Sequence, residues 1–359
     1  LKITKHPIPL PPITEIRMSS SNKTDIDVNS SITIVAAIFM AVIGPEIFIV
    51  VPGFVQGMVE YVGFSEQQAG YIASFELFAT AFTTVLMPFL SHRINWQHTF
   101  YLALGLAVLG NLLTLLADSY NVFILCRLIA GLGAGLLISL GFAVVGLTRN
   151  SERNFGFLVM WVLVYGAVVL MLMPYAYKTV GMNGVLCFFA IFAALGLPFV
   201  RYLPVNGDSI VHVESDAIEL SVLLKGSALM AMLIYFLGQG VVWTYLFLIG
   251  TAGGLSEQAV ANGLTLSQFS GIVGAFVAVV LANRLGRILP LTFSIIAGAC
   301  SLLLIMGEFD FLLYTTSVVI FNGLWNLTHP YLLASMASFD KKGKVVVYAA
   351  AMQMIGVSI

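Results

Sequence analysis

Long apolar segments, each separated from the next by a short polar turn, fill most of this sequence. Segments of about 20 apolar residues are typical of helices that cross a membrane, because a helix satisfies its own backbone hydrogen bonds in hydrocarbon. The pattern therefore predicts an all-α, polytopic membrane protein. We expect eleven helices, at Ile32–Met58, Glu66–Leu90, Trp96–Ala117, Val122–Leu147, Phe155–Tyr177, Met182–Leu203, Ser221–Ile249, Gln258–Ala282, Ile288–Met306, Phe311–Ser338 and Val345–Ile359.

One of these helices occurs twice in the sequence. The stretch Gly63–Arg93 begins GFSEQQ and the stretch Gly254–Arg284 begins GLSEQA, and their first and last residues are displaced by the same 191 positions (254 − 63 and 284 − 93). Repetition on this scale in an apolar chain predicts two related halves that face each other across a central path.

The longest polar insertion between helices, residues 204–220, predicts a linker between the halves. It would join an N-terminal six-helix bundle at residues 31–203 to a C-terminal bundle at residues 221–359. Residues 1–30 are polar and contain several prolines, which favours a disordered lead. Because a copy of the first half needs six helices, we expect the second bundle to be truncated in its fifth helix.

Composition supports a membrane protein and excludes several other classes. Hydrophobic residues make up 59% of the chain and charged residues 9%, against about a quarter charged in soluble proteins, so we expect the lipid bilayer to be its surroundings. The sequence contains no stripe of basic residues, so we do not expect it to bind nucleic acid. Cys126, Cys187 and Cys300 fall in apolar segments without a CxxC pair and are expected to be core residues. We expect no metal, no cofactor and a monomer.

The charges of the loops predict an orientation. If the N-terminus is inside, the opposite loops are acidic, with Lys178 as their one positive residue. Lysine and arginine gather on the cytoplasmic side of membrane proteins, which predicts a multi-pass protein of the cell inner (plasma) membrane. The cytoplasmic loops would then hold Arg93, Arg149, Arg153, Arg201–Lys225, Arg284, Arg287 and Lys341–Lys344.

Three ionisable residues are predicted to lie inside the membrane, where a charge costs several kcal/mol. Glu46 and Arg127 are expected to form a proton-coupling pair, with Glu76 as a second titrating or substrate-contacting group. The alternative is a structural ion pair. Glu76 shares a helical face with Ala73, Thr80, Thr83 and Thr84, so this face is expected to line a cavity, unless the threonines bond to their own helix.

Polar and aromatic residues at mid-depth of two further helices are expected to contact substrate. Such residues also serve as hydrogen-bonding partners between helices, and that alternative stays open. In the fourth helix, Gly131 and Gly135 form a GxxxG pattern, which indicates close helix packing. The expected substrate contacts are Gln239, Trp243, Asn322, Trp325, Asn326 and His329.

Three stretches resemble motifs of the major facilitator superfamily: Pro88–Gln97 (PFLSHRINWQ), its echo Val279–Ile288 (VVLANRLGRI) and Arg127–Gly135 (RLIAGLGAG). The resemblance implies two six-helix bundles, a central binding site and alternating access, and it gives Arg127 a role in proton coupling. By the same resemblance, the residues of the two gating loops are His92, Arg93, Arg284 and Arg287.

Taken together, these features predict a secondary active transporter of a small organic molecule, coupled to protons. One alternative is proton-driven efflux of lipophilic or cationic compounds, although the antiporter motif of the fifth helix is not present in residues 157–174. A second is a truncated carrier that does not transport. No His, Cys or Asp grouping has the spacing of an active site, so we expect the protein not to be an enzyme.

Overall fold

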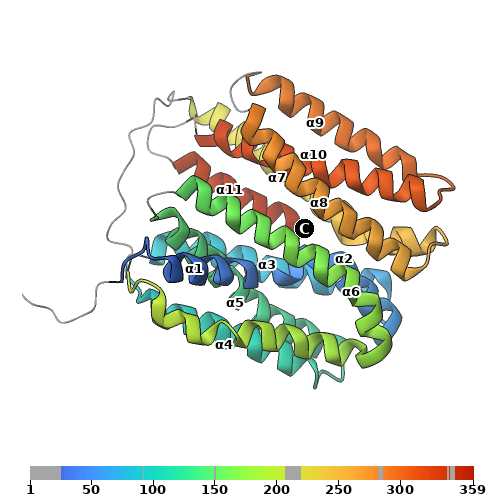
Figure 1. Cartoon of the computed structure of the whole chain (residues 1–359), viewed down its shortest axis with the longest axis horizontal. Coiled ribbons are helices and arrows are strands. Elements are labelled where there is room, and N and C mark those ends of the chain that lie inside the picture. The colour runs from blue at the N-terminus through green and yellow to red at the C-terminus, as the bar shows by residue number, and fades with distance from the viewer. Residues whose placement is uncertain are drawn as a thin grey trace, which may run out of the picture.

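Helices make up all the regular structure in the described part of the chain. The computed structural model describes residues 26–91, 93–148, 151–206, 220–281, 286–337, 339 and 344–359. The helices run side by side along one common direction (Figure 1). They are α1 (Ser31–Ile43), α2 (Glu46–Gly57), η1 (Met58–Val62), α3 (Glu66–Leu90), α4 (Trp96–Thr114), α5 (Tyr120–Gly146), α6 (Ser151–Ala194), η2 (Leu197–Tyr202), α7 (Val222–Ala252), α8 (Glu257–Leu281), α9 (Ile288–Ser301), η3 (Leu302–Ile305), α10 (Phe311–Ala337) and α11 (Lys344–Ser358).

The first predicted helix is broken near its middle. Helix α1 ends at Ile43, Gly44 and Pro45 form the junction, and α2 starts at Glu46. Proline has no backbone N–H to donate to the preceding turn, so the hydrogen-bond ladder stops there. The break gives α2 its own N-terminus inside the protein, and the carboxylate of Glu46 lies in its first turn, where the helix dipole favours a negative charge.

The internal repeat is also present in the backbone. Gly63 and Gly254, which are 191 positions apart, both adopt the left-handed conformation, with φ of 87° and 89°. Ser65 then caps α3 by accepting a hydrogen bond from the backbone N–H of Gln68. In the second copy Ser256 accepts one from the N–H of Ala259. The two copies therefore start their helices with the same glycine turn and serine cap.

The predicted count of eleven membrane-crossing helices is confirmed only in part. Among the described residues, seven stretches are long and apolar enough to cross a membrane. One of them, Phe157–Tyr202, covers both the fifth and the sixth predicted helix, which meet at Gly181, where the backbone is not helical (φ 66°, ψ −172°). Helices α4 and α10 fall outside the seven because their polar residues lower the mean hydropathy, and α11 has 15 residues, short of the ~20 needed.

The helices pack in two groups that touch along three seams. Helices α1 to α6 pack mainly with one another, as in the pairs α3/α5 and α4/α6, and α7 to α11 do the same in the pairs α8/α10 and α7/α11. The groups meet where α2 contacts α7, α3 contacts α11 and α6 contacts α8. Figure 1 shows α6 and α11 between α8 and α10 on one side and α1, α4 and α5 on the other. A path between the groups would follow these seams.

The two glycines of the GxxxG pattern bring α5 against α3, as predicted. A Cβ atom at Gly131 would collide with the backbone carbonyl of Glu76, and one at Gly135 would collide with the carbonyl of Thr80. Backbone atoms cannot move aside as a flexible side chain can. The close approach therefore fixes the position of Glu76 along the axis of α5.

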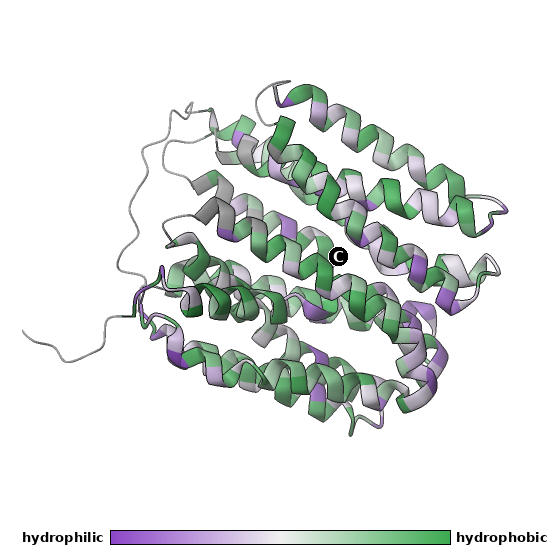
Figure 2. Cartoon of the chain, in the orientation of Figure 1, coloured by the Kyte–Doolittle hydropathy of each residue, from purple (hydrophilic) through white to green (hydrophobic). Residues whose placement is uncertain are grey.

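Large apolar side chains cover much of the exterior. Figure 2 shows hydrophobic residues along all the long helices. Phe82 on α3 and Phe276 on α8 are 55% and 65% exposed. Exposed surface of this kind indicates contact with lipid tails. The expectation that all three cysteines are core residues is confirmed only for Cys126, which is buried. Cys187 is half-buried and Cys300 is exposed, because apolar segments of this protein also face outward.

Two parts of the predicted organisation fall partly outside the described residues. These are residues 1–25 of the polar lead and residues 207–219 of the linker.

Replacing Gly135 with leucine is expected to destabilise the protein by about 1–3 kcal/mol, because the side chain must displace the backbone of α3. Gly105→Leu is the matched control, since a Cβ there meets no atom within 4 Å. The measurement is the thermal unfolding midpoint of the two purified variants in the same detergent. Equal midpoints would contradict the α3/α5 contact.

Candidate functional site

The three ionisable residues predicted at mid-membrane lie together inside the first group of helices. Glu46 comes from the start of α2, Glu76 from α3 and Arg127 from α5. Their exposed fractions are 5%, 4% and 0%. Burying a charge is costly unless partners surround it, so these three side chains must be considered as one unit.

Arg127 is paired with Glu76, whereas the sequence analysis paired it with Glu46. Its Nε lies 3.4 Å from Oε2 of Glu76. Its two terminal nitrogens both donate to Oδ1 of Asn111 on α4, at 2.9 Å each. The guanidinium carbon also lies 5.6 Å from the ring centroid of Phe54, within the range of a cation–π contact. The packing of α5 against α3 produces this pairing, because it places Arg127 beside α3.

Glu46 is left with an unpartnered oxygen. Its Oε2 is buried and accepts no hydrogen bond. Glu46, Glu76 and Asn111 line one cavity of about 20 Å³, which is large enough for about one water molecule. With both carboxylates ionised, the site would carry one negative charge in excess, since Arg127 supplies a single positive charge. One proton on either carboxyl group would make the site neutral.

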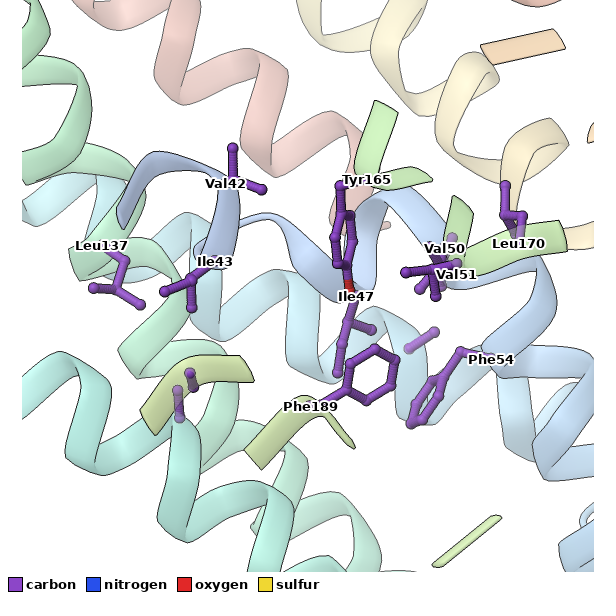
Figure 3. Close-up of a cluster of buried hydrophobic side chains, with 14 of the residues drawn as sticks. Val42, Ile43, Ile47, Val50, Val51, Phe54, Leu137, Tyr165, Leu170 and Phe189 are labelled. Carbon is purple, nitrogen blue, oxygen red and sulfur yellow. The ribbon is translucent and has the colours of Figure 1, made fainter. Parts of the chain in front are cut away.

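Apolar side chains enclose the segment that carries Glu46. Figure 3 shows Ile43 and Ile47 on either side of the helix break, with Phe189 beside Ile47. Ile43, Ile47 and Phe189 are all buried. A charge in such surroundings has few dipoles to stabilise it, so its protonation depends strongly on whichever charged group is nearest.

The threonines on the Glu76 face bind α3 to α5 and do not form the wall of a wide cavity. Thr80 donates to the carbonyl oxygens of Glu76 and Gly131, at 3.0 and 3.2 Å. Thr83 and Thr84 likewise donate to carbonyls of their own helix and of α5. Of the three, Thr80 alone also lines the small cavity. Glu76 and Thr80 therefore line the small cavity, whereas Thr83 and Thr84 hold α3 against α5.

Among the expected substrate contacts, the two tryptophans form an aromatic group between the two groups of helices. The indole N–H of Trp243 on α7 donates to the backbone oxygen of Phe48 on α2, at 3.1 Å. The rings of Trp243 and Trp325 lie 6.1 Å apart edge to face, and those of Phe48 and Trp325 lie 6.4 Å apart. Phe48 is two residues from Glu46, so α2 carries both the acid and one side of the aromatic group.

The polar residues of α10 bond mainly to neighbouring side chains and helices. Asn322 donates to the backbone oxygen of Ser267 on α8, at 2.9 Å, and Asn326 donates back to Asn322 at 3.0 Å. His329 pairs with Gln353 of α11, at 3.0 Å. These hydrogen bonds join α10 to α8 and α11, as the alternative of bonding between helices predicts. Gln239 differs, because its Oε1 is buried without a partner.

Comparison with known proteins identifies the family. The sequence model of the Major Facilitator Superfamily matches residues 32–359. The chain belongs to the Major Facilitator Superfamily. It is therefore a multi-pass membrane protein of a transporter family.

Solved structures of this superfamily share the fold. A D-xylose-proton symporter has a TM-score of 0.75 at 14% identity, with 91% of this chain and 88% of that chain covered. The xylose transporter of E. coli in an inward-open conformation has a TM-score of 0.71 at 15% identity, with 90% and 87% covered. Identity this low shows the fold alone. A search of curated proteins found no match.

Of the four gating-loop residues that the superfamily motif suggested, two are described. Arg93 is exposed in the turn after α3, and Arg287 is half-buried just before α9. His92 and Arg284 lie outside the described residues, as does Arg149. Among the described residues, no group of three or more His, Cys, Asp or Glu side chains could hold a metal ion.

Asn111 and Tyr165 lie close to the predicted site residues but were not among them. Asn111 is 1% exposed and holds the guanidinium of Arg127, and an asparagine inside an apolar helix was the available signal. Tyr165 of α6 stacks on Phe192, and its hydroxyl group is buried without a partner. Nothing in the local sequence distinguishes it from the tyrosines that face lipid.

Removing Arg127 is expected to destabilise the protein by about 3–5 kcal/mol, because Arg127→Met leaves the carboxylate of Glu76 buried without a counter-charge. Adding Glu76→Gln should recover much of this loss, since the double variant no longer buries the carboxylate of Glu76 without its partner. Unfolding midpoints in detergent measure both effects, with Arg93→Met at an exposed loop as the control. A double variant as unstable as Arg127→Met would contradict the pairing.

Proposed function

We propose that this protein is a proton-coupled secondary carrier of a small organic molecule in the cell inner (plasma) membrane. The observation that carries the proposal is a second buried acid, Glu46, beside the ion pair of Glu76 and Arg127, with one of its oxygens unpartnered at the cavity that Glu76 also lines. Such a site is neutral when it holds one proton and charged when it does not. Proton binding would therefore change the electrostatic energy of the site by several kcal/mol.

The proton would act through Arg127. When Glu46 is protonated, the guanidinium binds Glu76 and Asn111, as in the structure. When Glu46 loses its proton, its new charge competes with Glu76 for the same guanidinium. The side chains of α2, α3 and α5 would then rearrange, and the proton would thereby select between two arrangements of the helices.

The helix break connects this site to the rest of α2. A Cβ atom at Gly44 would lie 2.9 Å from the backbone nitrogen of Ile138 and 3.0 Å from the backbone oxygen of Ala134, so the junction rests directly on α5. A shift of Arg127 along α5 would reach the junction, and with it Phe48. We propose that proton binding and substrate binding are coupled along this segment, because Glu46 and Phe48 are two residues apart.

The substrate would lie at the seam between the two groups of helices, beside the aromatic group and the unpartnered oxygen of Gln239. We propose that residues 31–203 and 221–359 act as the two bundles of an alternating-access carrier, joined by the linker at residues 204–220. The contacts of α2 with α7, of α3 with α11 and of α6 with α8 would open and close in turn.

Glu46→Gln is expected to reduce substrate-driven proton uptake by at least about tenfold, because an amide does not take up a proton at physiological pH. The measurement uses proteoliposomes loaded with a pH-sensitive dye. D-xylose serves as the first probe because the structural neighbours carry it, followed by other sugars and small organic molecules. Glu60→Gln, an exposed acid of the same span, is the control. Full proton flux in Glu46→Gln would remove Glu46 from the mechanism.

Efflux of lipophilic cations is the second candidate function, and two observations favour it. The acid site has one negative charge in excess if both carboxylates ionise, and Trp243 and Trp325 offer ring faces that attract cations. Cells that produce the protein should then tolerate a lipophilic cation such as tetraphenylphosphonium better than cells that produce Glu46→Gln. Equal tolerance in both would exclude this function.

A further inference from the structure

Three elements from both groups of helices converge at the end of the bundle that is predicted to face outward. The hydroxyl group of Tyr61, in η1, donates to the carboxylate of Glu257, the first residue of α8, at 3.2 Å to Oε2. Nζ of Lys178, on α6, lies 3.7 Å from the same oxygen. The ring of Tyr61 stacks on Tyr177, with centroids 5.0 Å apart. Glu257 thus belongs to one group of helices and both its partners belong to the other.

We propose that Tyr61, Lys178 and Glu257 form an outer latch that holds the two groups of helices together on the outer side. The proposal rests on the alternating-access function proposed above. If the outer side opens, Glu257 must leave both partners at once, because both lie on the other group. Strengthening or weakening this contact would therefore shift the balance between outward-open and outward-closed states.

The charge of Glu257 suits a contact that must break and re-form. As the first residue of α8 it lies at the positive end of the helix dipole, and it is partly exposed. It therefore stays stabilised by the helix and by water after its partners leave. Lys178 is 64% exposed, so its ion pair alone is weak. The latch would favour the outward-closed state without preventing the outward-open state.

A second contact closes the same side in a related way. A Cβ atom at Gly70, on the second span of the first group, would collide with the hydroxyl group of Tyr245 on α7. Tyr61 lies on the first span of the first group and meets α8, the repeat of α3. Tyr245 lies on the first span of the second group and meets α3. Each group therefore contributes one tyrosine that meets a member of the repeated helix pair in the other group.

The test measures how fast a reagent in water reaches a residue that lies deeper in the protein than the latch. Gln56 lies five residues before Tyr61 in the same span and is 5% exposed. In a background where the native cysteines are serine, Gln56→Cys is labelled from outside with a membrane-impermeant maleimide in right-side-out vesicles. Glu257→Ala and Tyr61→Phe should each label about threefold to tenfold faster, the effect of losing one hydrogen bond of ordinary strength at a partly exposed site. Combining them should add little more, since both remove the same contact.

Controls separate opening from general loosening. Glu308→Ala removes an exposed acid that is predicted to lie on the same side, and it should leave the labelling rate unchanged. A cysteine at Ala103, which is 0% exposed inside the first group, should stay unlabelled in every latch variant. Gly70→Leu places a side chain against Tyr245 and so pushes α3 and α7 apart. It should raise labelling at Gln56→Cys even if Glu257→Ala folds poorly.

Unchanged labelling in Glu257→Ala and Tyr61→Phe would overturn the latch. Equal increases at Ala103→Cys would also overturn it, because they show a loosened bundle. The labelling needs neither a substrate nor a proton gradient. Faster labelling in the latch variants together with full proton flux in Glu46→Gln would keep the latch and reject the coupling proposal. Unchanged labelling together with lost proton flux in Glu46→Gln would keep the coupling proposal and reject the latch.

Discussion

The buried guanidinium of Arg127 joins α2, α3 and α4 to α5. A positive charge with no exposed surface needs partners from several directions, and here α3 supplies Glu76, α4 supplies Asn111 and α2 supplies the ring of Phe54. All these helices must therefore pass α5 at the same depth. The glycines of α5 permit this approach, since any larger residue would push α3 away. Packing and charge thus depend on each other at one level of the bundle.

The break between α1 and α2 gives the site its asymmetry. A continuous helix would hold Glu46 as one more residue on a regular face. The junction at Gly44 and Pro45 instead places Glu46 at a helix N-terminus inside the protein, beside a cavity and without a full set of hydrogen bonds. A buried polar group left in this state is costly, and such cost is typical of positions that change partners during function. The same short helix carries Phe48, which contacts the two tryptophans, and its extension η1 carries Tyr61. One span therefore touches the acid site, the aromatic group and the Tyr61–Glu257 contact.

The seams between the two groups of helices include contacts that can be exchanged. Trp243 donates to a backbone oxygen of α2, and Tyr61 and Lys178 meet Glu257. Buried apolar side chains of both groups also pack in one cluster. Inside the first group, glycine contacts between backbones hold α3 and α5 in place.

Hydropathy alone determined that the protein is helical and lies in a membrane, because a chain with 59% hydrophobic residues has few other ways to satisfy its backbone. The repeat of 191 positions likewise predicted two related halves, and the turns at Gly63 and Gly254 repeat in the backbone. The sequence also indicated which ionisable residues are buried, since the cost of a charge in hydrocarbon depends on depth along a helix. The partners of those residues depended on tertiary structure. Arg127 forms its ion pair with Glu76, and Asn322 donates a hydrogen bond to α8, because helix rotation and the height of each crossing come from packing between helices that are far apart in sequence.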